Sequence, residues 1–592
     1  MTPRAEYAAR LAARRSEREA LGARIERLTR LRTAAFAVGL ATLFLAFDFR
    51  LVPRWVVALP AAAFAGLVAA HQRTRRAERR MGRAVRFYEL GMARLDHAFA
   101  GRGSGGERFL DPEHPYAADL DLFGTGSLFE LLCTARTQAG EETLARWLLT
   151  PAAPTAVRDR QHAVADLRAR LDLRETTALL GEDVRGVIDP TALVAWATAA
   201  PWRPTAFERG VAMALPAATC AAVAAWNLGV LGPWPIPVAA AAQLAFALHL
   251  RSKVLPAIRR SAQPAAHLAL LAELLAVLER EAGDAPGLTT LRAEIADAGT
   301  PPSRRIARLE RLVDLLDAHR NQVFASVSFV LLWRTNCVLA IEAWRAECGA
   351  AVPRWLDAIG ESEALLALAS HAFEHPDDPF PELVDGPPRL DGAGLGHPLI
   401  AEERCVRNDV RLGGACRVLI VSGSNMSGKS TLLRTVGVNV VLALAGAPVR
   451  ARRLELTPLA VGAAIRIVDS LQDGTSRFYA EVKRLRRIVD LDAGPLPLLF
   501  LLDEILSGTN SHDRAIGAEA IVKTLAARGG LGLVTTHDLA LARMVDGLGA
   551  AVNVHFEDHL EDGRMCFDYR MRPGVVAKSN ALALMRAVGL EV

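Results

Sequence analysis

The chain of 592 residues lacks the cysteine patterns that mark zinc sites and disulfide frameworks. Its seven cysteines are scattered, and no two of them are separated by only two residues. This usage is typical of reduced thiols in a cytoplasm and excludes the usual zinc-ligand spacing. A cleavable signal peptide is not expected either, because a highly charged segment of 32 residues precedes the first apolar stretch.

A large charge of one sign is also lacking, since the formal net charge is only +5. Residues 1–32 contain nine arginines against four glutamates, and residues 73–86 contain seven arginines against one glutamate. The positive charge is therefore concentrated in two short segments, and the remainder of the chain is acidic. A generally cationic surface for nucleic acid is not indicated.

Charged side chains are missing altogether from residues 210–250, which contain no Asp, Glu, Lys or Arg. A membrane-spanning helix needs about 20 apolar residues, so this stretch is long enough for two. Its middle is rich in helix breakers and contains Trp226 and Trp234, where interfacial aromatic residues are expected. Basic residues flank both ends, so the positive-inside rule places both ends in the cytoplasm.

A second, weaker membrane hairpin is predicted over residues 33–72. Its apolar segments, 33–47 and 55–70, are short, and the turn between them contains charged residues. The two arginine-rich segments flank it, as cytoplasmic anchors on anionic lipid should. The alternative for both hairpins is that they are alanine-rich helices buried in a large soluble core. Much of the rest of 73–395 has a helical period, as in residues 266–282 and 304–319.

The C-terminal third contains a phosphate-binding loop in its required strand–loop–helix context, within residues 417–446. Gly423, Gly428, Lys429 and Ser430 fit the pattern, in which backbone N–H groups close around phosphate oxygens. Lys429 can reach the β- and γ-phosphates, and the Ser430 hydroxyl can bind Mg²⁺. We therefore expect ATP and Mg²⁺ as cofactors, bound by the segment Gly423, Ser424, Asn425, Met426, Ser427, Gly428, Lys429, Ser430 and Thr431.

Two further strands end in polar residues that suit this site. Residues 497–504 form an apolar run that ends in Asp503 and Glu504. We expect Asp503 to hold the Mg²⁺ and Glu504 to polarise the attacking water. Residues 532–538 form another apolar strand, at whose end His537 can contact the γ-phosphate. Lys429 and Glu504 are thus predicted catalytic residues, and the catalytic role of His537 depends on the resemblance described next, since a lone histidine at a strand end is more often structural.

These residues belong to segments that resemble the MutS family of DNA mismatch-repair ATPases. The similar segments are 422–437, 473–485, 501–521, 535–538 and 552–555, with 396–400 and 406–412 upstream of them and 121–151 at the start of a helical core. The resemblance implies a composite ATPase in which two copies face each other. It implies that Ser476 reaches the γ-phosphate of the partner copy and that Asn510 lies between the two sites. It also implies DNA as a partner, which no other sequence feature supports.

One position departs from the family's pattern. Where the family often stacks an aromatic side chain on adenine, this chain has Cys405, which cannot stack, and Arg407 can substitute only in part. Adenine selectivity is therefore left open. The short motif Phe87-Tyr88-Glu89 looks like a mismatch-reading wedge, but it lies in a helical stripe formed by Met81, Val85, Tyr88, Met92, Leu95 and Phe99. Phe87 and Glu89 then point in nearly opposite directions, so the motif does not read mismatches and the mismatch-recognition domain is missing.

The sequence thus predicts a multidomain protein with a mostly helical core, two transmembrane hairpins and a C-terminal α/β P-loop domain of the ATP-binding-cassette type. The expected parts are a basic helix (1–32), hairpin 1 (33–72), a helical segment (73–204), hairpin 2 (205–250), a helical lever (251–395) and the ATPase domain (396–592). The predicted protein is a homodimeric ATPase anchored in the inner or plasma membrane, with its ATPase domain in the cytoplasm, acting on DNA or on an unknown protein. The alternative is a soluble repair or recombination protein that binds mismatched or branched DNA.

Overall fold

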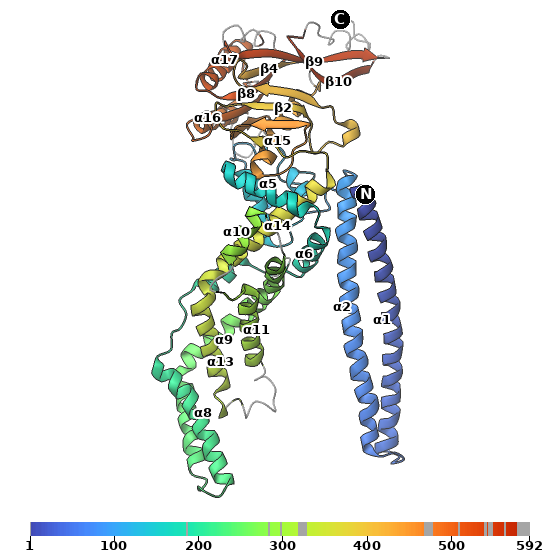
Figure 1. Cartoon of the computed structure of the whole chain (residues 1–592), viewed down its shortest axis with the longest axis vertical. Helices are drawn as coiled ribbons and strands as arrows, with labels where there is room; N and C mark the ends of the chain where they lie inside the picture. Colours follow the sequence, from blue (N-terminus) through green and yellow to red (C-terminus); the bar gives the residue numbers. More distant parts are fainter. Residues whose placement is uncertain are drawn as a thin grey trace.

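The computed structural model of the chain consists of an N-terminal helical hairpin, a helical body and a C-terminal α/β domain (Figure 1). It describes residues 2–184, 188–281, 285–295, 299–317, 328, 330–424, 426–466, 477–506, 509–537, 542, 549–561 and 564–576. The α/β domain lies at one end of the molecule, and both hairpins extend toward the other end (Figure 1).

The N-terminal hairpin is formed by two long antiparallel helices, α1 (Pro3–Phe47) and α2 (Ala58–Leu95), with the short helix η1 (Arg54–Val57) between them. The predicted basic helix and the predicted hairpin 1 are therefore not separate units, because α1 runs without a break past residue 32 and α2 past residue 72. Near the tip the rings of Phe36 and Phe64 face each other, with centroids 6.0 Å apart. Where the apolar segments end, the Thr29 hydroxyl lies 3.3 Å from Nε2 of His71.

The Phe87-Tyr88-Glu89 motif lies on α2, close to the base of this hairpin. Phe87 and Tyr88 are both buried, in a cluster with Tyr7 of α1. Glu89 is exposed on the opposite side and pairs with Arg15 at 2.7 Å. The burial of Tyr88 confirms the helical stripe, whereas the burial of Phe87 was not predicted by it, and the helix ends at Leu95 without extending to Phe99.

The helical body is made mostly of shorter helices, and a second hairpin, formed by α8 and the first part of α9, extends from it (Figure 1). Its core includes Trp344 and Trp355, whose rings pack at 6.4 Å. The body contains η2 (Glu107–Phe109), α3 (Leu128–Leu132), α4 (Gln138–Leu149), α5 (Pro154–Arg168), α6 (Leu171–Val184), α7 (Pro190–Thr198), α8 (Ala206–Asn227), α9 (Pro235–Arg280), α10 (Pro286–Ile295), α11 (Pro302–Asp317), α13 (Trp333–Cys348), η4 (Gly349–Ala351) and α14 (Val352–Glu374). Hairpin 2 was expected to end at residue 250, but α9 continues through this position into the body.

Four helices, α1, α2, α8 and α9, are long and apolar enough to cross a membrane by length and composition. Only 6% of the most apolar stretch of α1 and of α2 is buried, against 17% for α8 and 39% for α9. Large apolar side chains are exposed on both hairpins, including Phe36, Phe44, Trp55, Trp226 and Trp234. The apolar stretches of α1, α2 and α8 are thus mostly uncovered by the rest of the fold, whereas that of α9 is covered in part.

The α/β domain contains two sheets, with strand orders β1-β5-β2-β3 and β10-β9-β4-β8-β7-β6. The first sheet begins with β1 (Glu382–Leu383), so the domain starts upstream of the boundary expected at residue 396. Its further elements are β2 (Leu390–Leu395), η5 (Glu402–Arg404), β3 (Asn408–Leu412), β4 (Val418–Ser422), α15 (Lys429–Ala445), β5 (Arg453–Leu456), β6 (Ala460–Ala464), α16 (Arg477–Leu491), β7 (Leu498–Asp503), α17 (Ser511–Ala527), β8 (Leu531–Thr536), β9 (Ala551–Glu561) and β10 (Arg564–Pro573).

The centre of the larger sheet is parallel, and its strands are apolar runs because both faces are covered. Every residue of β4 and β8 is buried, and only the last residue of β7 is partly exposed. The register pairs Ser422 with Thr536 and Asp503 with Thr535. The carboxyl ends of β4, β7 and β8 therefore meet at one edge, where ligands bind in open α/β sheets.

Candidate nucleotide-binding site

The loop between β4 and α15 has the backbone conformation of a phosphate cradle. Gly423 and Gly428 have φ angles of 151° and 106°, in a region that side chains rarely permit. A Cβ atom at Gly423 would lie only 2.9 Å from the Ser427 hydroxyl and 3.1 Å from the carbonyl oxygen of Phe556. Gly428 is the N-cap of α15, so the positive end of the helix dipole points into the loop.

The side chains of the loop suit a phosphate group. Lys429 is buried, and its Nζ donates hydrogen bonds to the carbonyl oxygens of Gly423 at 2.7 Å and Ser424 at 2.9 Å. Within the described part of the chain, the hydroxyls of Ser424 and Ser427 are buried without a hydrogen-bond partner. Buried donors of this kind are normally satisfied, and phosphate oxygens would satisfy them. Met426 is exposed at the tip of the loop, and Asn425 lies outside the described residues.

The two predicted carboxylates lie directly across from this loop. Asp503 ends β7 and accepts a hydrogen bond from the hydroxyl of Thr535 on β8. The same hydroxyl accepts a hydrogen bond from the backbone N–H of Glu504 at 3.1 Å. Glu504 has a φ of 45°, which is uncommon outside glycine. The hydrogen bond to Thr535 holds the backbone in this strained turn.

The three predicted catalytic side chains converge at Glu504. Its Oε1 lies 3.3 Å from Nζ of Lys429 and 3.4 Å from Nδ1 of His537. His537 follows β8 and its side chain is about half exposed, which leaves it accessible to a ligand. Ser430 and Thr431, at the start of α15, line the same cavity as Asp503. An Mg²⁺ ion would find a hydroxyl and a carboxylate there, both of which are oxygen ligands that it prefers.

The cavity has a volume of about 1030 Å³ and also contains side chains that the sequence did not single out. Phe567 and Tyr569 of β10 line it, and their rings lie 6.0 Å apart. A Cβ atom at Gly428 would lie 3.1 Å from the ring of Tyr569, so this ring covers the end of the phosphate loop. Cys405 lines another part of the cavity. The aromatic surface that Cys405 cannot supply is thus available from β10.

Asn408 holds β10 in place over the cavity. Its Nδ2 donates to the carbonyl oxygen of Tyr569 at 3.0 Å, and its Oδ1 accepts from the N–H of Met571 at 2.8 Å. The register of β9 and β10 shifts between Phe567 and Met571, and Tyr569 has a φ of 54°. Simple alternation along β10 would have placed these aromatic residues on a strand face, but it could not reveal this bulge.

His397 lines the cavity from below β2 and carries no charge at neutral pH. Burial, together with the nearby charge of Arg434, lowers the pKa of His397 to about 4. Its Nδ1 accepts a hydrogen bond from the N–H of Leu399 at 3.2 Å. A neutral imidazole at this position is a hydrogen-bonding group rather than a counter-ion for phosphate.

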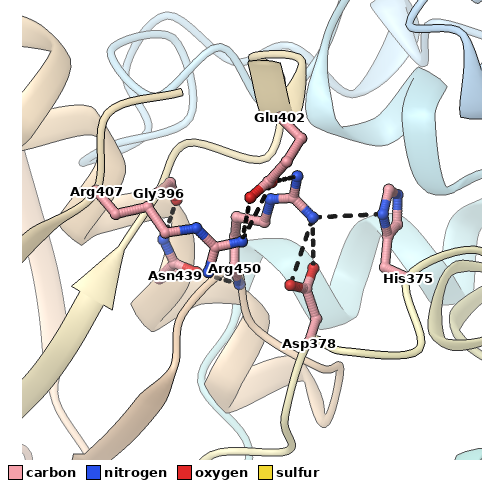
Figure 2. Close-up of polar contacts among 7 residues, drawn as sticks. All are labelled: His375, Asp378, Gly396, Glu402, Arg407, Asn439 and Arg450. Carbon is pink, nitrogen blue, oxygen red and sulfur yellow. Dashed lines mark hydrogen bonds and ion pairs between the residues drawn. The ribbon is translucent and has the colours of Figure 1, made fainter. Parts of the chain in front are cut away.

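A buried polar cluster connects this cavity to the helical body. Figure 2 shows Arg450 between Glu402, Asp378 and His375. The Arg450 guanidinium pairs with Glu402 and lies 3.3 Å from Asp378. The backbone N–H of Arg450 donates to Oδ1 of Asn439 on α15 at 2.8 Å.

The segment that contains Glu402 contacts both places. Cys405 and Val406 line the nucleotide cavity, whereas Glu402 and Arg407 line a second cavity on the other side, together with residues of α2 and α14. Arg407 itself donates to Glu402 at 3.0 Å. The segment 402–407 therefore connects the nucleotide cavity to the second cavity, where the N-terminal hairpin, the helical body and the α/β domain meet.

Of the predicted site residues, Asn510 lies away from the nucleotide cavity and Ser476 lies outside the described residues. Asn510 is the N-cap of α17, where its side chain accepts from the N–H of Asp513 at 2.9 Å. It does not line the cavity around Lys429. Ser476 lies outside the described residues, just before α16. The predicted roles of both residues in the partner's site remain predictions.

The loop, the parallel sheet and the acidic residues at its carboxyl edge define the class of P-loop nucleotide-binding domains. Residues 419–591 match the family model described as MutS domain V. The chain is 36% identical over 195 residues to the Endonuclease MutS2 of Thermus thermophilus, covering 33% of this chain and 25% of that protein. It is 34% identical over 237 residues to the DNA mismatch repair protein MutS 1 of Halobacterium salinarum, covering 39% and 27%. The similarity of this chain to MutS proteins thus lies in its C-terminal domain.

The similarity is confined to part of each protein. An Endonuclease MutS2 of Thermomicrobium roseum is 32% identical over 197 residues, which cover 33% of this chain and 24% of that relative. The chain thus spans about a quarter of the length of the curated relatives that it matches. The family model begins at residue 419 and does not include the two hairpins.

Proposed function

We propose that the protein is an Mg²⁺-dependent ATPase that is anchored in a membrane by its two hairpins. The observation that carries the ATPase part is the convergence of Lys429 and His537 on Oε1 of Glu504, beside the phosphate loop. Lys429 holds the phosphates, and Ser430 and Asp503 hold Mg²⁺, which neutralises phosphate charge when bound. Glu504 accepts the proton of the attacking water while His537 orients the same carboxylate.

Tyr569 and Phe567 supply the base-binding surface of this site. Their rings lie in the cavity at the end of the phosphate loop, and aromatic faces stack on purine bases. This arrangement makes adenine binding compatible with the presence of Cys405. It assigns to β10 the contact that other members of the family are expected to make from the 405–409 segment.

The arrangement of the hairpins supports the membrane part of the proposal. Their apolar ends lie at the same end of the molecule, far from the α/β domain, so one bilayer can receive both (Figure 1). On the N-terminal hairpin, arginines at 24, 27, 30 and 32 of α1 precede the first apolar segment, and arginines at 73, 75 and 76 of α2 follow the second. On the second hairpin, Lys253 pairs with Glu208 at 3.1 Å, just outside the charge-free stretch. Arg209 and Arg251 also flank the charge-free stretch, so the positive-inside rule supports a cytoplasmic α/β domain.

Buried polar contacts at the base of α1 and α2 connect the ATPase domain to the N-terminal hairpin. Glu374, at the end of α14, accepts hydrogen bonds from Nε of Arg94 at 3.0 Å and from the Tyr7 hydroxyl at 3.1 Å. The next residue, His375, lies 3.5 Å from the Arg450 guanidinium. ATP turnover would act through this junction on the hairpins and on a protein client or DNA near the membrane.

A homodimer through the ATPase domains completes the proposal. Phe478, Tyr479 and Val482, in the first turns of α16, are exposed and follow directly on the segment that contains Ser476. Exposed aromatic residues of this kind are enriched at protein interfaces. Ser476 would then reach the γ-phosphate bound by the partner copy.

The second candidate function is a soluble DNA repair or recombination protein. It is favoured by the names of the relatives, an endonuclease and a mismatch repair protein. Carbonate extraction of cell membranes separates the two proposals, followed by ATPase assays of the detergent-purified protein with and without duplex DNA. We expect the chain to stay in the membrane pellet. Release into the supernatant, together with DNA binding that weakens steeply with salt, would establish the soluble function instead.

A further inference from the structure

A basic cavity of about 480 Å³ lies where the N-terminal hairpin packs against the helical body. Among the residues that the structure describes, five arginines and two glutamates line it. The arginines come from three parts of the chain: Arg18 from α1; Arg79, Arg83 and Arg86 from α2; and Arg136 from the segment before α4. The floor is apolar and includes Phe87 and Leu179.

The glutamates neutralise only part of this charge. Glu78 accepts a hydrogen bond from Nε of Arg18 at 2.8 Å, and Glu182 lies 3.5 Å from Nε of Arg136. Arg79 and Arg86 are exposed, and neither has an ion-pair partner in the part of the chain that the structure describes. Like charges that gather in a concave site raise the local concentration of anions.

We propose that this cavity binds a soluble, phosphate-bearing anion of small-molecule size. Arginine presents a planar fork of N–H donors that matches phosphate oxygens, and every cation in the cavity is an arginine. The volume lies within the range of about 300–1,000 Å³ that is typical of small-molecule sites. Nothing in this site depends on the nucleotide cavity, which is formed by the α/β domain.

A lipid headgroup is the other source of the same chemistry, and the helix geometry disfavours it. The apolar segment of α2 ends at Ala70, nine residues before Arg79 and 16 before Arg86. At a rise of about 1.5 Å per residue, these arginines lie about 13 and 24 Å beyond the hydrocarbon edge. The headgroup layer extends only about 5–8 Å on each side, so a lipid phosphate stops short of the cavity.

Occupancy of the cavity has a structural consequence. Arg79, Arg83 and Arg86 belong to the N-terminal hairpin, whereas Arg136 and Leu179 belong to the helical body. The hairpin already touches the body here, because Nη1 of Arg83 donates to the carbonyl oxygen of Leu179 at 3.3 Å. A bound anion would add charge-assisted hydrogen bonds to both sides and so tie the hairpin to the body.

Calorimetry with pyrophosphate tests the proposal on the full chain in phosphatidylcholine nanodiscs, with Mg-ADP present to fill the nucleotide cavity. We expect saturable binding that is at least about tenfold weaker in Arg79→Gln/Arg86→Gln. The matched control is Arg75→Gln/Arg76→Gln, which removes the same charge from exposed positions of α2 outside the cavity and should change the affinity less than about twofold. All four positions are exposed, so both variants should fold, and Mg-ADP affinity checks this.

Repeating the titration in nanodiscs that contain phosphatidic acid distinguishes the two sources of phosphate. An unchanged affinity for pyrophosphate supports a soluble ligand, because the lipid does not reach the cavity. A weakened affinity would assign the site to a lipid headgroup and overturn the soluble source. Absence of saturable binding, or an equal loss in both double variants, would overturn the site altogether. Failure of the ATPase assay would leave these outcomes unaffected, since hydrolysis is not measured.

Discussion

The carboxylate oxygen Oε1 of Glu504 lies 3.3 Å from the ammonium nitrogen of Lys429. The two residues follow different strands of the parallel sheet and are 75 positions apart in the chain. Their contact depends on the neighbouring Thr535, whose hydroxyl accepts a hydrogen bond from the backbone N–H of Glu504. The pair joins the group that holds phosphate to the group that accepts a proton, so substitutions at the two positions should have different effects.

Replacing Glu504 with glutamine should abolish turnover but preserve ATP binding. Glutamine keeps the size of the side chain and removes its basicity, and a general base contributes about 10²–10⁴ to the rate. Lys429→Ala should instead weaken both binding and turnover, because it removes a charge that contacts phosphate. Steady-state ATPase rates and equilibrium nucleotide binding measure the two effects. Unchanged rates in both variants would contradict the assigned site.

Replacing Tyr569 with alanine should weaken ATP binding about tenfold or more, since stacking of a base on an aromatic ring contributes about 1–3 kcal/mol. Tyr569→Phe keeps the ring and should bind ATP nearly as well as the native protein. Fluorescent nucleotide titration measures the affinities. If the Tyr569→Ala variant bound ATP as tightly as the native protein and Tyr569→Phe, Tyr569 would not contact the base.

Replacing Arg450 with alanine should destabilise the protein by about 3–5 kcal/mol, because Asp378 would remain as a buried carboxylate without its partner. Arg453→Ala is the matched control. It also removes an arginine that pairs with an aspartate, Asp391, but this pair is largely exposed and should contribute less than about 1 kcal/mol. Urea unfolding of the detergent-solubilised protein measures the difference. Equal effects of the two substitutions would contradict the buried pair.

Stability should fall as the pH is lowered from 7 to 5, in part because of His397. Burial lowers the pKa of His397 to about 4, below its ordinary value of 6.5. Between these two values the unfolded chain binds a proton that the folded protein does not, so acid favours unfolding. At pH 5 this single group should contribute a loss of about 2 kcal/mol.

The variant His397→Gln isolates this contribution, because glutamine can accept the hydrogen bond from Leu399 without titrating. Its loss of stability between pH 7 and 5 should be about 2 kcal/mol smaller than that of the native chain. Asp378 has the opposite dependence, since burial raises its pKa to about 6 and acid then favours folding. This effect is common to both proteins and cancels in the comparison. An identical pH dependence would show that His397 titrates normally.

Elements with local signals could be predicted from the amino-acid sequence. The glycine spacing around Lys429 predicted the strand, loop and helix that the structure contains, because backbone conformation at Gly423 and Gly428 requires glycine. The apolar runs over residues 497–504 and 532–538 predicted two buried strands, which the structure has as β7 and β8. The period of residues 81–95 likewise identified Tyr88 as a buried side chain of a helix.

Contacts between residues far apart in the chain could not be predicted in this way, and they follow from how the elements pack. The tertiary structure continued α1 and α9 through the boundaries expected at 32 and 250, because a helix ends where its backbone is capped and not where its apolar residues stop. It brought Tyr569 over the phosphate loop through a bulge that has no sequence signature, and it gathered Arg18, Arg83 and Arg136 around one cavity. Such contacts depend on how whole elements pack, and packing is a property of surfaces that no short stretch of sequence contains.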